Sequence, residues 1–346
     1  MTAGLILFSA RNRQNNIFQT LIGLILFSTS ADRAIYGILA RLGISTAYST
    51  TIRQLHAMAN TSREFLKNLG LSTFDTTRFT ARYILIYDNI NKHQRAWLQR
   101  LSLQDRVQSG TSATIVMLQN APDEAFDPTV LAANRAKNER SELTTDVLLD
   151  DINFPKLSQA GVGQILRVMI KHIPPLSQHA EALKEAYASR WATHRIEPTR
   201  SQIHPLCTTS IDESKMVGNR DVLYNSFLTQ IQLCKNKVQS MLFLVTGDQL
   251  SIQRLRSLVI TTAKDIIGFA QHLWFVPLIA FWHMKWAFQR CVVRVSWFSS
   301  QASGVHGLAQ DAATLRRNIN PTKCDFYPTH RLIEVSFHAH VLTALG

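Results

Sequence analysis

The sequence of 346 residues has few cysteines and lacks the short motifs that mark several enzyme classes. It has no G-x-x-x-x-G-K-[ST] phosphate loop, no G-x-G-x-x-G after a strand, no H-E-x-x-H and no G-x-S-x-G. These absences argue against the corresponding nucleotide-binding, dinucleotide-dependent, metalloprotease and serine hydrolase classes. The four cysteines are far apart and form no C-x-x-C pair, which is typical of reduced thiols in an intracellular protein, and no zinc site is assigned to them. They are Cys207, Cys234, Cys291 and Cys324.

Acidic residues are also scarce. The chain has 24 Asp and Glu against 37 Lys and Arg, which gives a formal net charge of +13. Such a balance favours a polyanionic partner, either nucleic acid or an anionic membrane surface, because neutralising phosphates releases counterions. The hydrophobic content of 46% argues against disorder, and the length allows one large domain or two or three small ones.

The N-terminus does not have the order of a secretory signal, because a short apolar run precedes Arg11 and Arg13. A longer run, Ile266 to Met284, contains no formal charge and has about the length of a bilayer span. It also contains Pro277, two histidines and a glutamine, and Lys285 follows at once. A buried helix plus strand is therefore favoured, and a membrane-associated protein with a span near 266–284 is the alternative.

Two apolar runs that end in an acid carry the chemical hypothesis. Tyr83 to Tyr87 is followed by Asp88, and Met241 to Val245 is followed, after Thr-Gly, by Asp248. The first run predicts a strand that is buried on both faces and has a carboxylate at its tip. On neighbouring strands, Asp88 and Asp248 would share Mg²⁺, which prefers oxygen ligands and would activate a water or a 3′-hydroxyl for phosphodiester chemistry. The alternative is that each is a strand-end acid that binds turn amides.

A third acid normally completes such a site, and Glu334, Asp311 and Asp325 are all compatible with that role. His283 is predicted either near the site or in the core. A basic amphipathic helix is expected over residues 251–264, with Arg254 and Arg256 near solvent, where they either contact phosphates or have no partner.

Residues 1–75 are predicted to be helical. One helix over 32–42, a turn at Gly43 and a second helix over 46–59 resemble a helix-turn-helix, in which Arg53 and Gln54, with Ser49 and Thr50, would face a groove. A plain helical hairpin explains the same spacing. A polar connector is expected over 60–80.

The remaining pattern predicts an α/β fold. A strand that ends in an acid, followed by two more strands before any helix, suggests the opening of a ribonuclease H-like mixed sheet. We expect the first part of this sheet over 76–120, a helical insertion over 121–239 and the second part over 240–346, truncated at its C-terminus.

An ordered series of motifs spans most of the chain. The motifs are Arg11-Asn12-Arg13, Phe18 to Ser28, Gly37 to Ser45, Tyr87 to Ile90, Gly110 to Thr114, His204 to Leu206, Ile211 to Ser214, Gly218-Asn219, Gly247 to Ser251, Arg254 to Arg256 and Asp325 to Thr329. This series resembles a large domain family of mushroom-forming (basidiomycete) fungi, whose function is unknown. We interpret that family as derived from ribonuclease H-like (DDE-type) transposases. The chain departs from the family pattern in having Trp282-His283 where Phe-His is expected, and in ending at Gly346.

Together these observations predict a nuclear, transposase-derived protein that binds DNA through residues including Arg53, Arg254 and Arg256. Its expected activity is Mg²⁺-dependent phosphodiester cleavage at Asp88 and Asp248. If the third acid lies beyond Gly346, the alternative is a catalytically inactive DNA-binding remnant.

Overall fold

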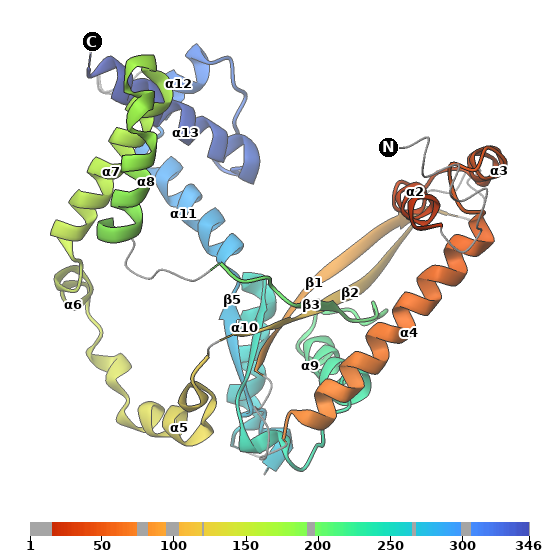
Figure 1. Cartoon of the computed structure of the whole chain (residues 1–346). Coiled ribbons are helices and arrows are strands. Elements are labelled where there is room, and N and C mark those ends of the chain that lie inside the picture. Colours follow the sequence, from red (N-terminus) through yellow and green to blue (C-terminus); the bar gives the residue numbers. More distant parts are fainter. Residues whose placement is uncertain are drawn as a thin grey trace. The chain divides into compact units, whose positions relative to one another are not determined.

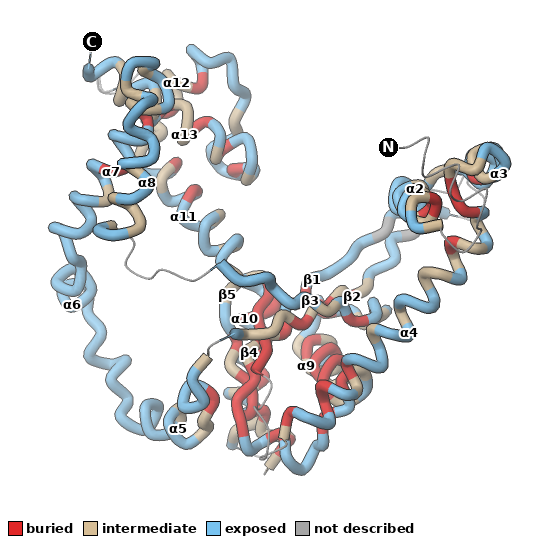
Figure 2. Tube along the Cα trace, in the orientation of Figure 1, coloured by how far each residue is buried: buried red, intermediate tan, exposed pale blue. Residues whose placement is uncertain are grey.

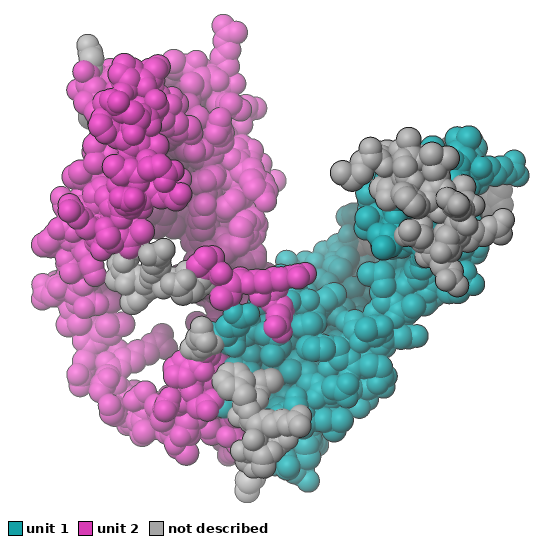
Figure 3. Space-filling view, viewed as in Figure 1, with its two compact units in different colours: residues 1–119, 203–238 teal, residues 120–202, 239–346 magenta. Residues whose placement is uncertain are grey.

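The computed structural model describes residues 16–74, 82–94, 104–119, 121–191, 198–264, 268–298 and 306–345. The chain divides into two compact units (Figure 3). Unit 1 comprises residues 1–119 and 203–238, and unit 2 comprises residues 120–202 and 239–346. Both units contain helices and strands, so the predicted α/β class is confirmed (Figure 1).

Unit 1 begins with three helices, α2 (Ile17–Ser28), α3 (Arg33–Arg41) and α4 (Tyr48–Ser72). The Asp32 side chain caps α3 by accepting a hydrogen bond from the Ala34 N–H. Gly43 makes the predicted turn with a φ of 70°, a left-handed conformation that glycine adopts without steric cost. The predicted helices on both sides of this turn are confirmed.

The polar connector predicted over residues 60–80 is wrong over its first part, because α4 continues to Ser72. Leu66 and Leu69 are both buried and lie three residues apart, on one face of the helix. Packing of this apolar face holds residues 60–72 in the helix despite their polar composition. Residues 75–80 lie outside the described part of the chain.

Unit 1 contains three antiparallel strands: β1 (Tyr83–Gln94), β2 (Arg106–Met117) and β3 (Ile203–Pro205). The prediction that the first strand ends at Asp88 is wrong. Asp88 lies in the middle of β1 opposite Ser112, and the polar residues after it stay extended because β2 pairs with them as far as Gln94.

The predicted burial of this strand on both faces is also wrong. Leu85 and Tyr87 are buried, whereas Ile86 between them is 38% exposed, which is the alternation of a strand with one solvated face. The two further strands were predicted over residues 93–100 and 110–118. The second is confirmed as β2, whereas residues 95–100 of the first lie outside the described part of the chain, and β3 comes after the helices of residues 123–191.

Helix α9 (Met216–Tyr224) continues as a π-helical turn over Asn225–Gln230 and belongs to unit 1. The buried Tyr87 hydroxyl of β1 donates a hydrogen bond to Asn219 Oδ1 at 2.6 Å. This bond ties α9 to β1.

The helical insertion predicted over residues 121–239 is divided between the units, because residues 203–238, which include β3 and α9, belong to unit 1. Residues 121–202 belong to unit 2, and much of the surface of this segment from α5 to α6 is exposed (Figure 2). Its elements are η1 (Asp123–Phe126), α5 (Pro128–Lys137), η2 (Glu139–Glu142), α6 (Thr145–Asp150), α7 (Phe154–His172), η3 (Pro174–His179), α8 (Ala180–Ala186) and η4 (Tyr187–Trp191).

The rest of unit 2 is built on two parallel strands, β4 (Phe243–Gly247) and β5 (Phe275–Ile279). Burial is concentrated along β4, as Figure 2 shows. Each strand is followed directly by a helix. The helices of this part, with the short turns between them, are η6 (Val238–Ser240), α10 (Gln249–Thr262), η7 (Gly268–Gln271), α11 (Phe281–Ser296), α12 (Leu308–Thr314) and α13 (Phe326–Thr343).

The uncharged run Ile266 to Met284 falls within this unit. Its described part consists of η7, β5 and the first turn of α11, which is the helix plus strand that the sequence favoured. Among the described residues, no helix combines the length and the apolar character that crossing a membrane requires.

Candidate functional site

A polar pocket lies where the two parallel strands of unit 2 end. Helix α10 begins directly after β4 and α11 directly after β5, so both helix N-termini lie at the same edge of the strand pair. Ligands of open α/β sheets usually bind at such carboxyl ends of parallel strands. The pocket has a volume of about 400 Å³ and is lined by Asp248, Gln249, Leu250, Gln253, His283, Trp286, Ala287 and Arg290.

Asp248 is the acid of this pocket. It follows the last residue of β4, as predicted, and it is the N-cap of α10. Its Oδ1 atom accepts a hydrogen bond from the Ser251 N–H at 2.6 Å. Its other oxygen, Oδ2, makes no hydrogen bond with any described residue and is available to a cation. The side chain is half-buried, so one carboxylate both caps the helix and faces the pocket.

The other wall of the pocket is one face of α11. His283, Trp286 and Arg290 are spaced at i, i+3 and i+7, which places them on the same side of a helix. The Trp286 Nε1–H donates to the Cys324 carbonyl at 2.7 Å, which fixes the indole ring. His283 is half-buried and Arg290 is exposed.

This combination suits an anion that carries a divalent cation. The N-terminus of α10 and Arg290 favour a phosphate group, which guanidinium binds in bidentate fashion. Asp248 alone would repel phosphate. With Mg²⁺ between them the repulsion becomes an attraction, because carboxylate and phosphate oxygens are both ligands that Mg²⁺ prefers.

The two acids of the predicted metal pair belong to different units. Asp88 lies in unit 1, in the interior of β1. It is exposed, and its Oδ1 accepts a hydrogen bond from the Asn89 N–H at 2.9 Å. Asp248 lies in unit 2. Among the described residues, neither acid belongs to a group of three side chains that could hold a metal ion.

None of the three candidates for the third acid lines the pocket. Glu334 on α13 accepts from Arg331 at 3.2 Å, and Asp325 is the N-cap residue of α13. Asp311 on α12 hydrogen-bonds to His306 and His340.

The three arginines predicted to bind nucleic acid differ in exposure and in the unit to which they belong. Helix α10 is amphipathic as predicted, with Leu255 and Leu258 buried, Arg254 half-buried and Arg256 exposed. Arg53 on α4 is exposed and belongs to unit 1, whereas the two arginines of α10 belong to unit 2.

Gln54 was expected to face a groove, and this prediction is wrong. Its side chain donates to Thr20 Oγ1 at 3.0 Å, so it joins α4 to α2. Residue type alone could not reveal this, because Thr20 is 34 residues away in the chain.

Arg290 and Gln253 are the pocket residues that sequence reasoning missed. The helical spacing of His283, Trp286 and Arg290 was a usable signal, since it predicts one face that carries an imidazole, an indole and a guanidinium. The missing information was that this face lies opposite Asp248, which depends on the parallel pairing of β4 with β5.

The fold and the pocket define a mixed α/β protein with a polar site at the carboxyl ends of its parallel strands. The chain belongs to a family of unknown function, DUF6589, whose model matches residues 138–346, more than half of the chain. No curated protein and no solved structure shows a significant match to this chain.

Proposed function

We propose that this protein binds nucleic acid and that the pocket between α10 and α11 holds a backbone phosphate through Mg²⁺ on Asp248. The observation that carries the proposal is the meeting of Asp248, Arg290 and the N-terminus of α10 in one pocket. An acid and an arginine that line the same pocket are explained together by a cation-bound phosphate.

The net charge of +13 supports a polyanionic ligand of this kind. Arg254 and Arg256 on α10 and Arg53 on α4 are the residues proposed to contact further phosphates. Such contacts position a nucleic acid without reading its sequence.

We also propose a specific fold within the α/β class, the ribonuclease H-like fold, and the order of elements supports it. Three antiparallel strands are followed by two parallel ones, and a helix follows each of the last three strands. In this scheme the helices between β2 and β3 are an insertion, and the protein descends from a DDE-type transposase of basidiomycete fungi that acts in the nucleus.

Cleavage of a phosphodiester requires a second acid. Asp88 is the residue proposed to supply it, and Mg²⁺ would activate the attacking water. If Asp88 does not contribute, the same pocket serves a catalytically inactive DNA-binding remnant, which is the second candidate function.

The test compares Asp248→Asn with Asp127→Asn. Asp127 is the N-cap of α5 and accepts from the Thr129 N–H at 2.7 Å, so it matches Asp248 in structural role. Asparagine is also a good N-cap, so both variants keep the cap and lose only the charge. Binding of labelled duplex and single-stranded DNA is measured with Mg²⁺, with Mn²⁺ and with EDTA.

We expect Asp248→Asn to lower the metal-dependent affinity by at least about tenfold, or roughly 1.4 kcal/mol, and Asp127→Asn to leave it unchanged. Equal affinity of both variants and the wild type would remove Asp248 from the site. Nicking that is lost in both Asp88→Asn and Asp248→Asn supports the nuclease, whereas metal-dependent binding without nicking supports the inactive remnant.

A further inference from the structure

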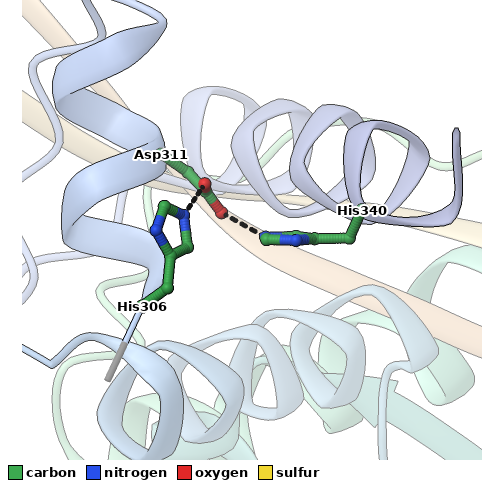
Figure 4. Close-up of side chains that lie close together, drawn as sticks. All are labelled: His306, Asp311 and His340. Atoms are coloured by element: carbon green, nitrogen blue, oxygen red, sulfur yellow. Dashed lines mark hydrogen bonds and ion pairs between the residues drawn. The ribbon is translucent and has the colours of Figure 1, made fainter. Parts of the chain in front are cut away.

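A second group of potential metal ligands lies in unit 2, away from the residues that line the pocket. It consists of His306, Asp311 and His340, whose ligand atoms all lie within 4.8 Å of one another. Figure 4 shows the three side chains converging, with the carboxylate between the two imidazoles. His306 precedes α12, Asp311 lies within α12, and His340 lies in the last turns of α13.

The carboxylate is the fixed member of the group. Asp311 Oδ1 lies 2.6 Å from His306 Nε2, and Oδ2 lies 3.1 Å from His340 Nε2. The Ser336 hydroxyl also donates to Oδ2. The Asp311 side chain is 15% exposed, against 54% for His306 and 57% for His340, so solvent reaches the group from the side of the imidazoles.

The packing below the group holds its members in place. Leu308 and Ala312 of α12 and Leu332 of α13 are buried in one apolar cluster with Val293 of α11. Ser336 lies one turn before His340 on α13, so the residue that orients the carboxylate shares a face with one of the imidazoles. Ligands supported in this way keep their geometry.

We propose that His306, Asp311 and His340 bind a divalent transition-metal ion, with Zn²⁺ as the representative ion. Two imidazole nitrogens and one carboxylate oxygen form a donor set for Zn²⁺ and Fe²⁺, whereas Mg²⁺ and Ca²⁺ prefer oxygen ligands alone. To bind a metal through Nε2, each imidazole would carry its proton on Nδ1 instead, so the Nε2–H hydrogen bond to the carboxylate would be given up, while Ser336 would continue to hold Oδ2. Three protein ligands leave a fourth position open to water or to a ligand.

This site does not depend on the proposed function, because it uses other residues and another class of ion. The rival explanation is that the group is only a hydrogen-bonded clamp between α12 and α13. A clamp predicts that removing either imidazole lowers stability and that no metal binds.

The test measures Zn²⁺ binding to the full-length, metal-stripped chain by equilibrium dialysis, and Co²⁺ binding by visible absorption. The variants are His306→Gln and His340→Gln, whose exposed side chains can change without opening the core. His338→Gln is the matched control, because His338 lies on the same helix and contacts His172 at 3.1 Å instead of a carboxylate. Circular dichroism checks that each variant is folded.

We expect the wild type and His338→Gln to bind one Zn²⁺ per chain. Ser336→Ala should weaken binding about tenfold, the lower end of what losing an orienting residue costs, and the two ligand variants should weaken it further. Absence of stoichiometric Zn²⁺ binding in the wild type, or equal binding by the wild type and both ligand variants, would overturn the proposal. Equal losses in His338→Gln and the ligand variants would overturn it too.

Discussion

At the scale of single residues, the hydrogen bonds of Asn219 explain the residue types of the Gly218-Asn219 motif. Its amide nitrogen donates to the carbonyls of Glu213 at 2.5 Å and Lys215 at 2.9 Å, and its Oδ1 accepts from the Tyr87 hydroxyl. The neighbouring Gly218 leaves room for the chain, since a Cβ there would lie 1.8 Å from the Asp212 carbonyl oxygen. The Gly218-Asn219 motif therefore fastens the 212–215 loop to β1.

Removing the Tyr87 hydroxyl tests this role. Tyr87 is 1% exposed, so Tyr87→Phe leaves the Asn219 oxygen buried and short of a partner. We expect the free energy of unfolding to fall by about 1 to 3 kcal/mol in urea titrations. Tyr327→Phe is the control, because Tyr327 is 74% exposed, and it should unfold like the wild type. If the two variants unfold alike, the bond contributes nothing to stability.

At the scale of elements, β3 packs on α4 through a histidine. The His204 ring stacks on Phe65 with centroids 4.0 Å apart, and its Nε2 is buried without a hydrogen-bond partner among the described residues. Burial lowers the pKa of His204 below the usual value of 6.5. The folded unit thus favours the neutral imidazole, because no acceptor is present for a second N–H.

This contact should make stability depend on pH. The unfolded chain takes up the His204 proton at a higher pH than the folded chain does. The contribution is therefore fully present above about pH 6.5 and is lost as the pH falls from there toward the lowered pKa. Urea unfolding should show the stability advantage of the wild type over His204→Leu shrinking between about pH 7.5 and pH 5.5.

His56→Leu is the control for this experiment. His56 lies on α4, the helix against which His204 packs, but its side chain is exposed. This variant should leave the slope of stability against pH unchanged. A constant difference between the wild type and His204→Leu at both pH values would contradict the assignment.

Elements defined by a local pattern were predicted well from the sequence. The amphipathic spacing gave α10 with Leu255 and Leu258 buried, and the break after an apolar run placed Asp248 at the end of β4. The extent of β1 could not be predicted, because its polar half pairs with β2 and its own sequence does not encode that pairing. The same limit applies to the sites. His340 meets Asp311 across 29 residues of sequence, and only the packing of α13 on α12 brings them together.

At the scale of the whole molecule, charge is the property that most constrains the partner. A net charge of +13 on a folded chain implies an electrostatic attraction to polyanions that does not depend on any one site. Under the proposed function, the pocket adds a local, metal-dependent component to this general attraction. The two components respond differently to salt and to EDTA, so they can be measured separately.

The general component predicts a steep dependence on salt. If about six phosphates are contacted, log Kd should rise with log salt with a slope near 5, and affinity for a short duplex should fall about a thousandfold between roughly 50 and 200 mM salt. Arg256→Gln should lower this slope by about one, because one phosphate contact is lost. Lys67→Gln should change it less, since the Lys67 ammonium already pairs with Glu64 at 3.1 Å. Fluorescence anisotropy with EDTA present isolates this component, and a slope near zero would show that the positive charge of the chain serves a purpose other than binding nucleic acid.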